Sequence, residues 1–131
     1  LEPRRVTDLA AEAVSIGLEC VVEVHNEDEL DSLDLSTIQA ISINNRDPFT
    51  FEMDVYTSVR LKKHIPTDKV VIADGGIVTT NEISLLLSHG IHAFLVGGQP
   101  WNADPSAKAL KDLIEMYQQS AAKIDLLQVK K

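Results

Sequence analysis

Three apolar runs of this chain end at polar residues that could bind an anion or move a proton. The first run encloses Glu23, the second ends at Asn44 and Arg46, and the third ends at Asp74. A carboxylate enclosed by valines, as Glu23 is, is a candidate general acid or base with a pKa raised by burial. Asn44 can donate and accept hydrogen bonds, whereas Arg46 can clamp a carboxylate or phosphate. Asp74 could bond a ribose-like hydroxyl.

Each of these residues also has a structural alternative. Glu23 would be a buried salt-bridge partner or an acid at the rim of a barrel, and Asn44 would satisfy backbone groups of a loop. Arg46 would pair with an acidic neighbour, Asp47 or Glu52, in its own loop. Asp74, at the end of the third run, would be a turn residue. The residue types alone leave both interpretations open.

Two glycine pairs follow the last two apolar runs. Gly75 and Gly76 come after the run at 70–74, and Gly97 and Gly98 come after the run at 93–96. Glycines directly after a buried strand let the backbone approach a ligand and turn its N–H groups outward. At the ends of consecutive strands, they predict one shared cradle for a phosphate or another small anion.

Alternating strands and helices must position these groups. Unbroken apolar runs predict buried strands, and helical spacing with capping residues predicts the helices between them. The expected strands cover residues 18–24, 38–43, 69–73 and 92–96. The expected helices cover residues 4–16, 26–33, 54–64, 79–89 and 104–122. This alternation predicts an α/β fold with a parallel sheet, in which the carboxyl ends of the strands share one edge.

The pattern leaves two architectures open, namely an open doubly wound sheet and half of an eight-stranded barrel. We expect a single domain over residues 1–131, with a leading helix at 1–17, four βα units at 18–122 and a tail at 123–131. In a half barrel, the first and last strands would be unprotected apolar edges. We therefore expect association with a second copy, a missing N-terminal half or another protein subunit. Otherwise the sheet would open flat, with helices on both faces.

The composition argues against several classes of partner and cofactor. The formal charge of −8 disfavours nucleic acid and anionic membranes as partners. Cys20 is the only cysteine, so no disulfide framework exists, and we interpret Cys20 as a small core residue. The four histidines do not form a pattern of metal ligands and the chain lacks clustered carboxylates, so we expect no metal, and we expect no cofactor. We expect a soluble protein of a reducing compartment, such as the cytoplasm or the plastid stroma.

Five short motifs occur in a fixed order along the chain. They are VVEVH at 21–25, INNRD at 43–47, TFEMD at 50–54, ADGGI at 73–77 and LVG at 95–97. Their order and spacing resemble the C-terminal half of indole-3-glycerol phosphate synthase, a (βα)8 barrel enzyme of tryptophan biosynthesis. The resemblance covers nearly the whole chain and implies four consecutive βα units of a TIM-barrel-like sheet, a half barrel preceded by one helix. The implied partner is a phosphorylated small-molecule substrate.

The resemblance also implies roles for single residues. Glu23 would be the catalytic glutamate for the acid–base steps of ring closure. Asn44 would be the active-site asparagine, and Arg46 would position the substrate. The catalytic carboxylate of the seventh strand would correspond to Asp74. The substrate phosphate would lie against the glycine positions Gly75, Gly76, Gly97 and Gly98.

The chain departs from the family pattern at three places. Asp74-Gly75-Gly76 replaces the usual Glu-Ser-Gly, and Gly98-Gln99-Pro100-Trp101 replaces the usual Glu/Ser-Ser-Leu-Met. The essential lysines of the family lie in the first four strands, which have no counterpart here. The motif at 73–77 also resembles the phosphate loop of inosine monophosphate dehydrogenase. Three hypotheses follow: a half barrel that is inactive alone, a non-catalytic binding or assembly subunit, and a phosphate-binding module.

Overall fold

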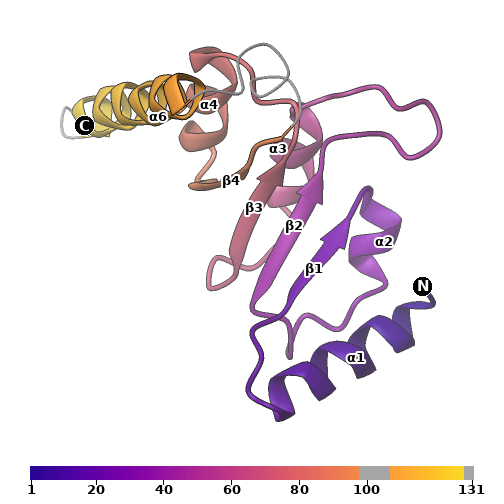
Figure 1. Cartoon of the computed structure of the whole chain (residues 1–131). Coiled ribbons are helices and arrows are strands. Elements are labelled where there is room, and N and C mark those ends of the chain that lie inside the picture. The colour runs from indigo at the N-terminus through magenta and orange to yellow at the C-terminus, as the bar shows by residue number, and fades with distance from the viewer. Residues whose placement is uncertain (98–106, 129–131) are drawn as a thin grey trace.

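The computed structural model describes residues 1–97 and 107–128 (Figure 1). The elements in chain order are α1 (Pro3–Ser15), β1 (Val21–Val24), α2 (Glu27–Asp31), β2 (Ala40–Asn44), α3 (Tyr56–Lys62), β3 (Val70–Asp74), α4 (Thr80–Ser88), β4 (Ala93–Leu95) and α6 (Ala107–Gln128). The strands lie in the order β1-β2-β3-β4, and every pairing is parallel. The predicted α/β fold of consecutive βα units behind one leading helix is confirmed.

The strand order distinguishes the two architectures that the sequence left open. A doubly wound sheet reverses its strand order at a switch point, whereas this order follows the chain without reversal. Because crossovers between parallel strands are right-handed, a sequential order places the connecting helices on one face of the sheet. The arrangement therefore fits half of a TIM-barrel-like fold, and the alternative of helices on both faces is wrong for α2, α3 and α4.

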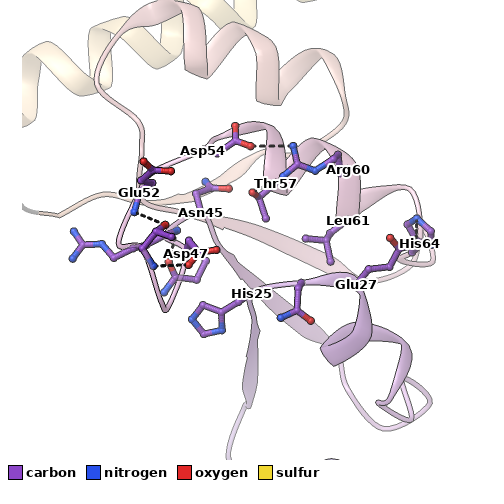
Figure 2. Close-up of a pocket in the computed structure, with 14 residues that line it drawn as sticks. His25, Glu27, Asn45, Asp47, Glu52, Asp54, Thr57, Arg60, Leu61 and His64 are labelled. Carbon is purple, nitrogen blue, oxygen red and sulfur yellow. Dashed lines mark hydrogen bonds and ion pairs between the residues drawn. The ribbon is translucent and has the colours of Figure 1, made fainter.

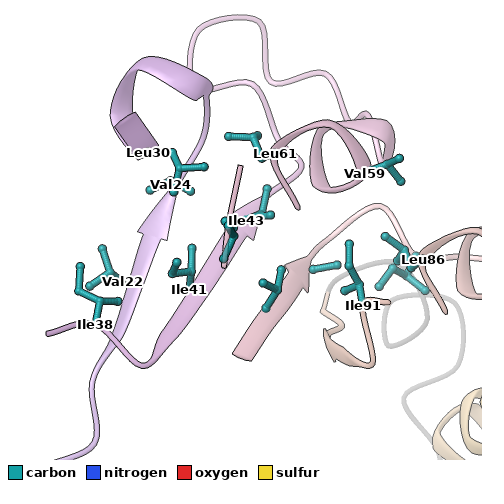
Figure 3. Close-up of a cluster of buried hydrophobic side chains, with 14 of the residues drawn as sticks. Val22, Val24, Leu30, Ile38, Ile41, Ile43, Val59, Leu61, Leu86 and Ile91 are labelled. Carbon is teal, nitrogen blue, oxygen red and sulfur yellow. The ribbon is translucent and has the colours of Figure 1, made fainter. Parts of the chain in front are cut away.

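The two faces of the sheet differ in burial. The strand side chains that face the helices are nearly inaccessible to solvent. They pack with helix residues such as Leu30, Leu61 and Leu86 to form the core (Figure 3). These strand side chains are Val22, Val24, Ile41, Ile43, Val71 and Ala73. On the opposite face, Val21, Val70 and Leu95 are 52%, 54% and 52% exposed. That uncovered face corresponds to the interior of a closed barrel. Within the described residues, the large apolar side chains of one face of the sheet are buried and several of those on the other face are exposed.

The observed elements differ from the expected ones mainly at their ends. β1 begins at Val21 because α1 ends in a Schellman motif, in which Gly17 (φ 83°) is left-handed and Leu18 N–H donates to the Ala13 carbonyl at 2.9 Å. Helix α6 continues to Gln128, so most of the expected tail is helical. The expected start of this helix, at residues 104–105, lies outside the described residues.

One buried amide ties the ends of β2, β3 and α3 together. Asn45 is 1% exposed, and its Nδ2 donates to the Gly75 carbonyl at 2.9 Å. Its Oδ1 accepts from the Ser58 backbone N–H at 3.1 Å and from the Ser58 hydroxyl at 2.8 Å. Its backbone N–H donates to the Asp74 carbonyl, and its own carbonyl accepts from the Asp54 N–H. Asn45 therefore ties the start of α3 to the ends of β2 and β3, which carry Asn44, Arg46 and Asp74.

The substitution Asn45→Ala should lower the free energy of unfolding by about 2–4 kcal/mol in urea denaturation. It leaves the Ser58 N–H and the Gly75 carbonyl without partners, and each buried unsatisfied group costs about 1–3 kcal/mol. The matched control is Asn81→Ala, since Asn81 is exposed in the first turn of α4. This control should change stability by less than about 0.5 kcal/mol. Equal effects of the two substitutions would contradict the role of Asn45.

Candidate functional site

A cavity of about 680 Å³ opens at the carboxyl ends of β2, β3 and β4. Six of the predicted site residues line it: Asn44, Arg46, Asp74, Gly75, Gly76 and Gly97. Gly98, the remaining glycine of the predicted cradle, lies outside the described residues. The strand-end prediction therefore brings most of the candidate residues to one cavity. It also places apolar side chains there, including Met53 and Leu95.

Glu23 lies beside this cavity on the uncovered face of the sheet. Its Oε1 is 3.4 Å from Asn44 Nδ2 and 3.5 Å from His25 Nε2. Its side chain is 48% exposed, so the expected burial of Glu23 is wrong. The alternation along β1 turns Val22 and Val24 toward the helices and Glu23 toward the open face. The carboxylate is therefore accessible to a ligand from that face.

Asp74 is a second carboxylate at the same edge, paired in register with Asn44. Burial raises the pKa of the Asp74 carboxyl, as does the nearby charge of Glu23, while Arg46 and His25 act in the opposite direction. An acid with a raised pKa binds its proton more tightly in the folded chain, so Asp74 opposes folding at neutral pH. Groups kept at such a disadvantage are typical of functional sites.

Arg46 stands at the start of the loop between β2 and α3. Its backbone N–H donates to Asn44 Oδ1 at 2.9 Å, and it pairs with Met53 in an antiparallel bridge. The Asp47 N–H donates to the Glu52 carbonyl at 2.9 Å, which closes the same hairpin. Within the described residues, the Arg46 guanidinium makes no ion pair with either acid. The salt-bridge alternative for Arg46 is therefore wrong in this part of the chain.

The glycines of the expected cradle have different roles. Gly75 and Gly76 have φ angles of 78° and 75°, a region that side chains rarely adopt. The Gly75 N–H donates to the Leu95 carbonyl at 3.0 Å, so the expectation that it turns outward is wrong. This bond links β3 to β4. The N–H groups of Gly76 and Gly97 make no hydrogen bond to the described residues. These two positions remain candidates for contact with an anion.

A second cavity of about 470 Å³ adjoins the first near Asn44 and Arg46 (Figure 2). Several of its charged groups are already paired. Arg60 Nη1 lies 3.0 Å from Asp54 Oδ2, and His64 Nε2 lies 3.1 Å from Glu27 Oε1. The second pair links α2 to the turn that follows α3. This cavity is therefore better explained by ion pairs between elements than by an anion site.

Two residues that the sequence reasoning left without a role contribute to the geometry. Asn45 follows Asn44 directly, so alternation along an extended strand would point it to the opposite, buried face. That alternation is the sequence signal that could have identified it. His25 lies against the candidate acid Glu23.

In residues 1–97 and 107–128, no three His, Cys, Asp or Glu side chains gather in a way that could hold a metal ion. None of the described helices combines the length and apolar character needed to cross a membrane.

Comparisons with known proteins agree with the motif order. Residues 1–113 match the family model described as indole-3-glycerol phosphate synthase. The indole-3-glycerol phosphate synthase of Legionella pneumophila (strain Paris) is 37% identical over 114 residues, which are 87% of this chain and 44% of that protein. The one from Caldanaerobacter subterraneus subsp. tengcongensis is 45% identical over 85 residues, 65% of this chain and 33% of that protein. The chain thus spans less than half the length of these relatives.

A solved structure supports the fold independently. A chain in the crystal structure of the Amycolatopsis orientalis BexX/CysO complex superposes with a TM-score of 0.63 at 16% identity. The match covers 92% of this chain and 48% of that chain. At this identity, the likeness concerns the fold alone. The family follows from the sequence matches, which confirm the resemblance seen in the motifs: the chain belongs to the indole-3-glycerol phosphate synthase family.

Proposed function

We propose that this chain is the C-terminal half barrel of an indole-3-glycerol phosphate synthase, inactive alone and active in the decarboxylating ring closure of tryptophan biosynthesis when its barrel is closed. The observation that carries the proposal is the convergence of Glu23, Asn44 and Asp74 at one edge of the sheet. Asn44 lies between the other two, 3.4 Å from Glu23 Oε1 and in register with Asp74. Two carboxylates in different environments suit acid–base chemistry.

Each residue then has a chemical role in ring closure. Glu23 exchanges protons with the substrate from the accessible side of β1, and Asn44 orients it by donating from Nδ2. Asp74, whose pKa is raised by burial, acts as a second proton-transfer group. The guanidinium of Arg46, which makes no ion pair within the described residues, holds the substrate carboxylate. The substrate phosphate binds the N–H groups of Gly76 and Gly97, which make no hydrogen bond in the described part of the chain.

The need for a partner follows from the uncovered face. The chain spans 44% of the Legionella pneumophila relative, and the family's essential lysines belong to the half that this chain does not match. Both β1 and β4 have an unpaired edge among the described strands. A groove of about 450 Å³ runs between α1 and β1, and its apolar walls include Leu9 and Val22. An N-terminal half barrel would cover the face, pair the edges and supply the lysines.

A second candidate function is a phosphate-binding subunit without catalysis. It is favoured by the altered loop at Gly75, where the family usually has serine. The φ angle of Gly75 is 78°, a backbone conformation that residues with side chains rarely adopt. A serine at this position would therefore be strained in the observed loop. In this function the glycine cradle persists, and Asp74 does not transfer protons.

Turnover of carboxyphenylaminodeoxyribulose phosphate should appear when the chain is mixed with the N-terminal part of the Legionella pneumophila relative. In the active complex, Glu23→Gln should lower kcat by about 10²–10⁴-fold, because an amide cannot exchange the proton. The control Glu19→Gln removes an exposed carboxylate just before β1 and should leave kcat unchanged. An assembled complex without turnover would favour the non-catalytic subunit.

Phosphate binding can be tested on the chain alone with ribose 5-phosphate, using ribose as the control ligand. At a hundredfold excess over the dissociation constant, binding should stabilise the fold by about 2.7 kcal/mol, measured by thermal denaturation. Gly97→Ala should remove this gain without changing the stability of the ligand-free chain. The added methyl group meets no atom within 4 Å among the described residues, so it should intrude mainly on a bound ligand. An undiminished gain in Gly97→Ala would refute the cradle at this position.

A further inference from the structure

His25 lies between two carboxylates, one at the candidate site and one on a neighbouring helix. Its Nε2 is 3.5 Å from Glu23 Oε1, and its Nδ1 is 3.3 Å from Glu29 Oε2. The imidazole is the least exposed of the three, at 25%, compared with 48% for Glu23 and 46% for Glu29. Contacts between side chains therefore run from Glu29 on α2, through His25, to Glu23 on the open face of the sheet.

The outer carboxylate is held in place by the start of α2. Asn26 is the N-cap of this helix, and its Oδ1 accepts from the Glu29 N–H at 2.9 Å. Glu29 Oε2 reaches back and accepts from the backbone N–H of His25 at 2.7 Å. The capping interactions thereby place one carboxylate oxygen against both the backbone and the ring of His25. The helix start and the imidazole are fixed together.

This geometry favours one tautomer of the neutral His25 ring. A neutral imidazole carries one N–H, and the hydrogen bond made by one ring nitrogen decides the state of the other. Both neighbouring carboxylates accept hydrogen bonds, but Glu29 is the nearer one and is fixed by the backbone N–H of His25, so we infer that Nδ1 carries the proton of the neutral ring and donates to Glu29. The other nitrogen, Nε2, then faces Glu23 with a free lone pair. In water the Nε2–H tautomer predominates, so the protein holds His25 in the less common form.

Other charged groups also surround the imidazole. Asp47 of the loop after β2 and Asp74 of β3 lie near enough to interact with it electrostatically. The charge of Arg46 acts on Asp74 in the same direction as that of His25, since both lower the pKa of the Asp74 carboxyl. The imidazole therefore contacts the carboxylates of Glu23 and Glu29, and those of Asp47 and Asp74 lie within electrostatic range of it.

We propose that His25 is a positioning residue that relays protons to and from Glu23, with Glu29 holding its tautomer. The inference rests on the proposed function, in which Glu23 exchanges protons with substrate. When Glu23 has taken a proton from the substrate, that proton passes from Oε1 to Nε2. The carboxylate is restored and an imidazolium forms between Glu23 and Glu29. In the reverse step, the imidazolium returns the proton to Glu23 and becomes the neutral Nδ1–H form.

The first test measures the tautomer in the full chain by ¹⁵N–¹H correlation spectroscopy of the histidine rings, which requires no activity. Neutral His25 should show the Nδ1–H pattern, and Glu29→Gln should shift it toward Nε2–H. Glu27→Gln is the matched control, because Glu27 opens the same helix but pairs with His64. It should leave the pattern of His25 unchanged. An Nε2–H pattern in the unaltered chain would overturn the inference.

The second test follows kcat/KM against pH in the complemented barrel. His25→Gln should lower kcat by about tenfold with little change in KM, and it should change the dependence of kcat/KM on pH. Glu29→Gln should give a smaller change in the same direction, and Glu27→Gln none. An unaltered profile in His25→Gln would overturn the relay. An inactive complex that shows the Nδ1–H pattern would overturn the proposed function while supporting the tautomer that Glu29 imposes.

Discussion

The buried amide of Asn45 is the interaction on which the geometry of the site depends. It holds the end of β3 through the Gly75 carbonyl and the start of α3 through Ser58. Its backbone continues the pairing between β2 and β3 by one residue, since its N–H donates to the Asp74 carbonyl. A polar group can occupy this buried position only because each of its hydrogen-bonding atoms has a partner. Asn44 and Asp74 pair at the edge of the sheet. The hydrogen bonds of the next residue, Asn45, hold the ends of their two strands together.

The one-sided burial of the sheet is the second constraint. The pairings among β1, β2, β3 and β4 are all parallel and follow the chain order, so the connecting helices cover a single face. The other face carries exposed valine and leucine side chains together with Glu23. Ser42 lies in register with Glu23, and its hydroxyl is buried without a hydrogen-bond partner among the described residues. Both the apolar exposure and the unpaired hydroxyl suit a face that is completed by further chain. The candidate chemistry is on that same face.

The sequence predicted the order and type of the elements because they depend on local periodicity and capping. The strand-end rule brought Asn44, Arg46 and Asp74 to one edge without knowledge of contacts. The burial of Glu23 could not be read in this way, because valine neighbours in sequence do not say which face of a strand is covered. The N–H of Gly75 was expected to face a ligand, yet it pairs with Leu95, which is distant in sequence. Such errors arise wherever a partner comes from a different βα unit.

We propose above all that the uncovered face becomes the interior of a closed barrel and that both sheet edges become paired within its wall. Hydrogen exchange of the backbone amides, with and without the N-terminal part of the Legionella pneumophila relative, tests this most directly. We expect the outward-facing amides of Val21–Val24 and Ala93–Leu95, at opposite edges of the sheet, to become protected together. Amides of β2, which is already paired on both sides, should change little. Protection at neither edge, or at α6 alone, would contradict the claim.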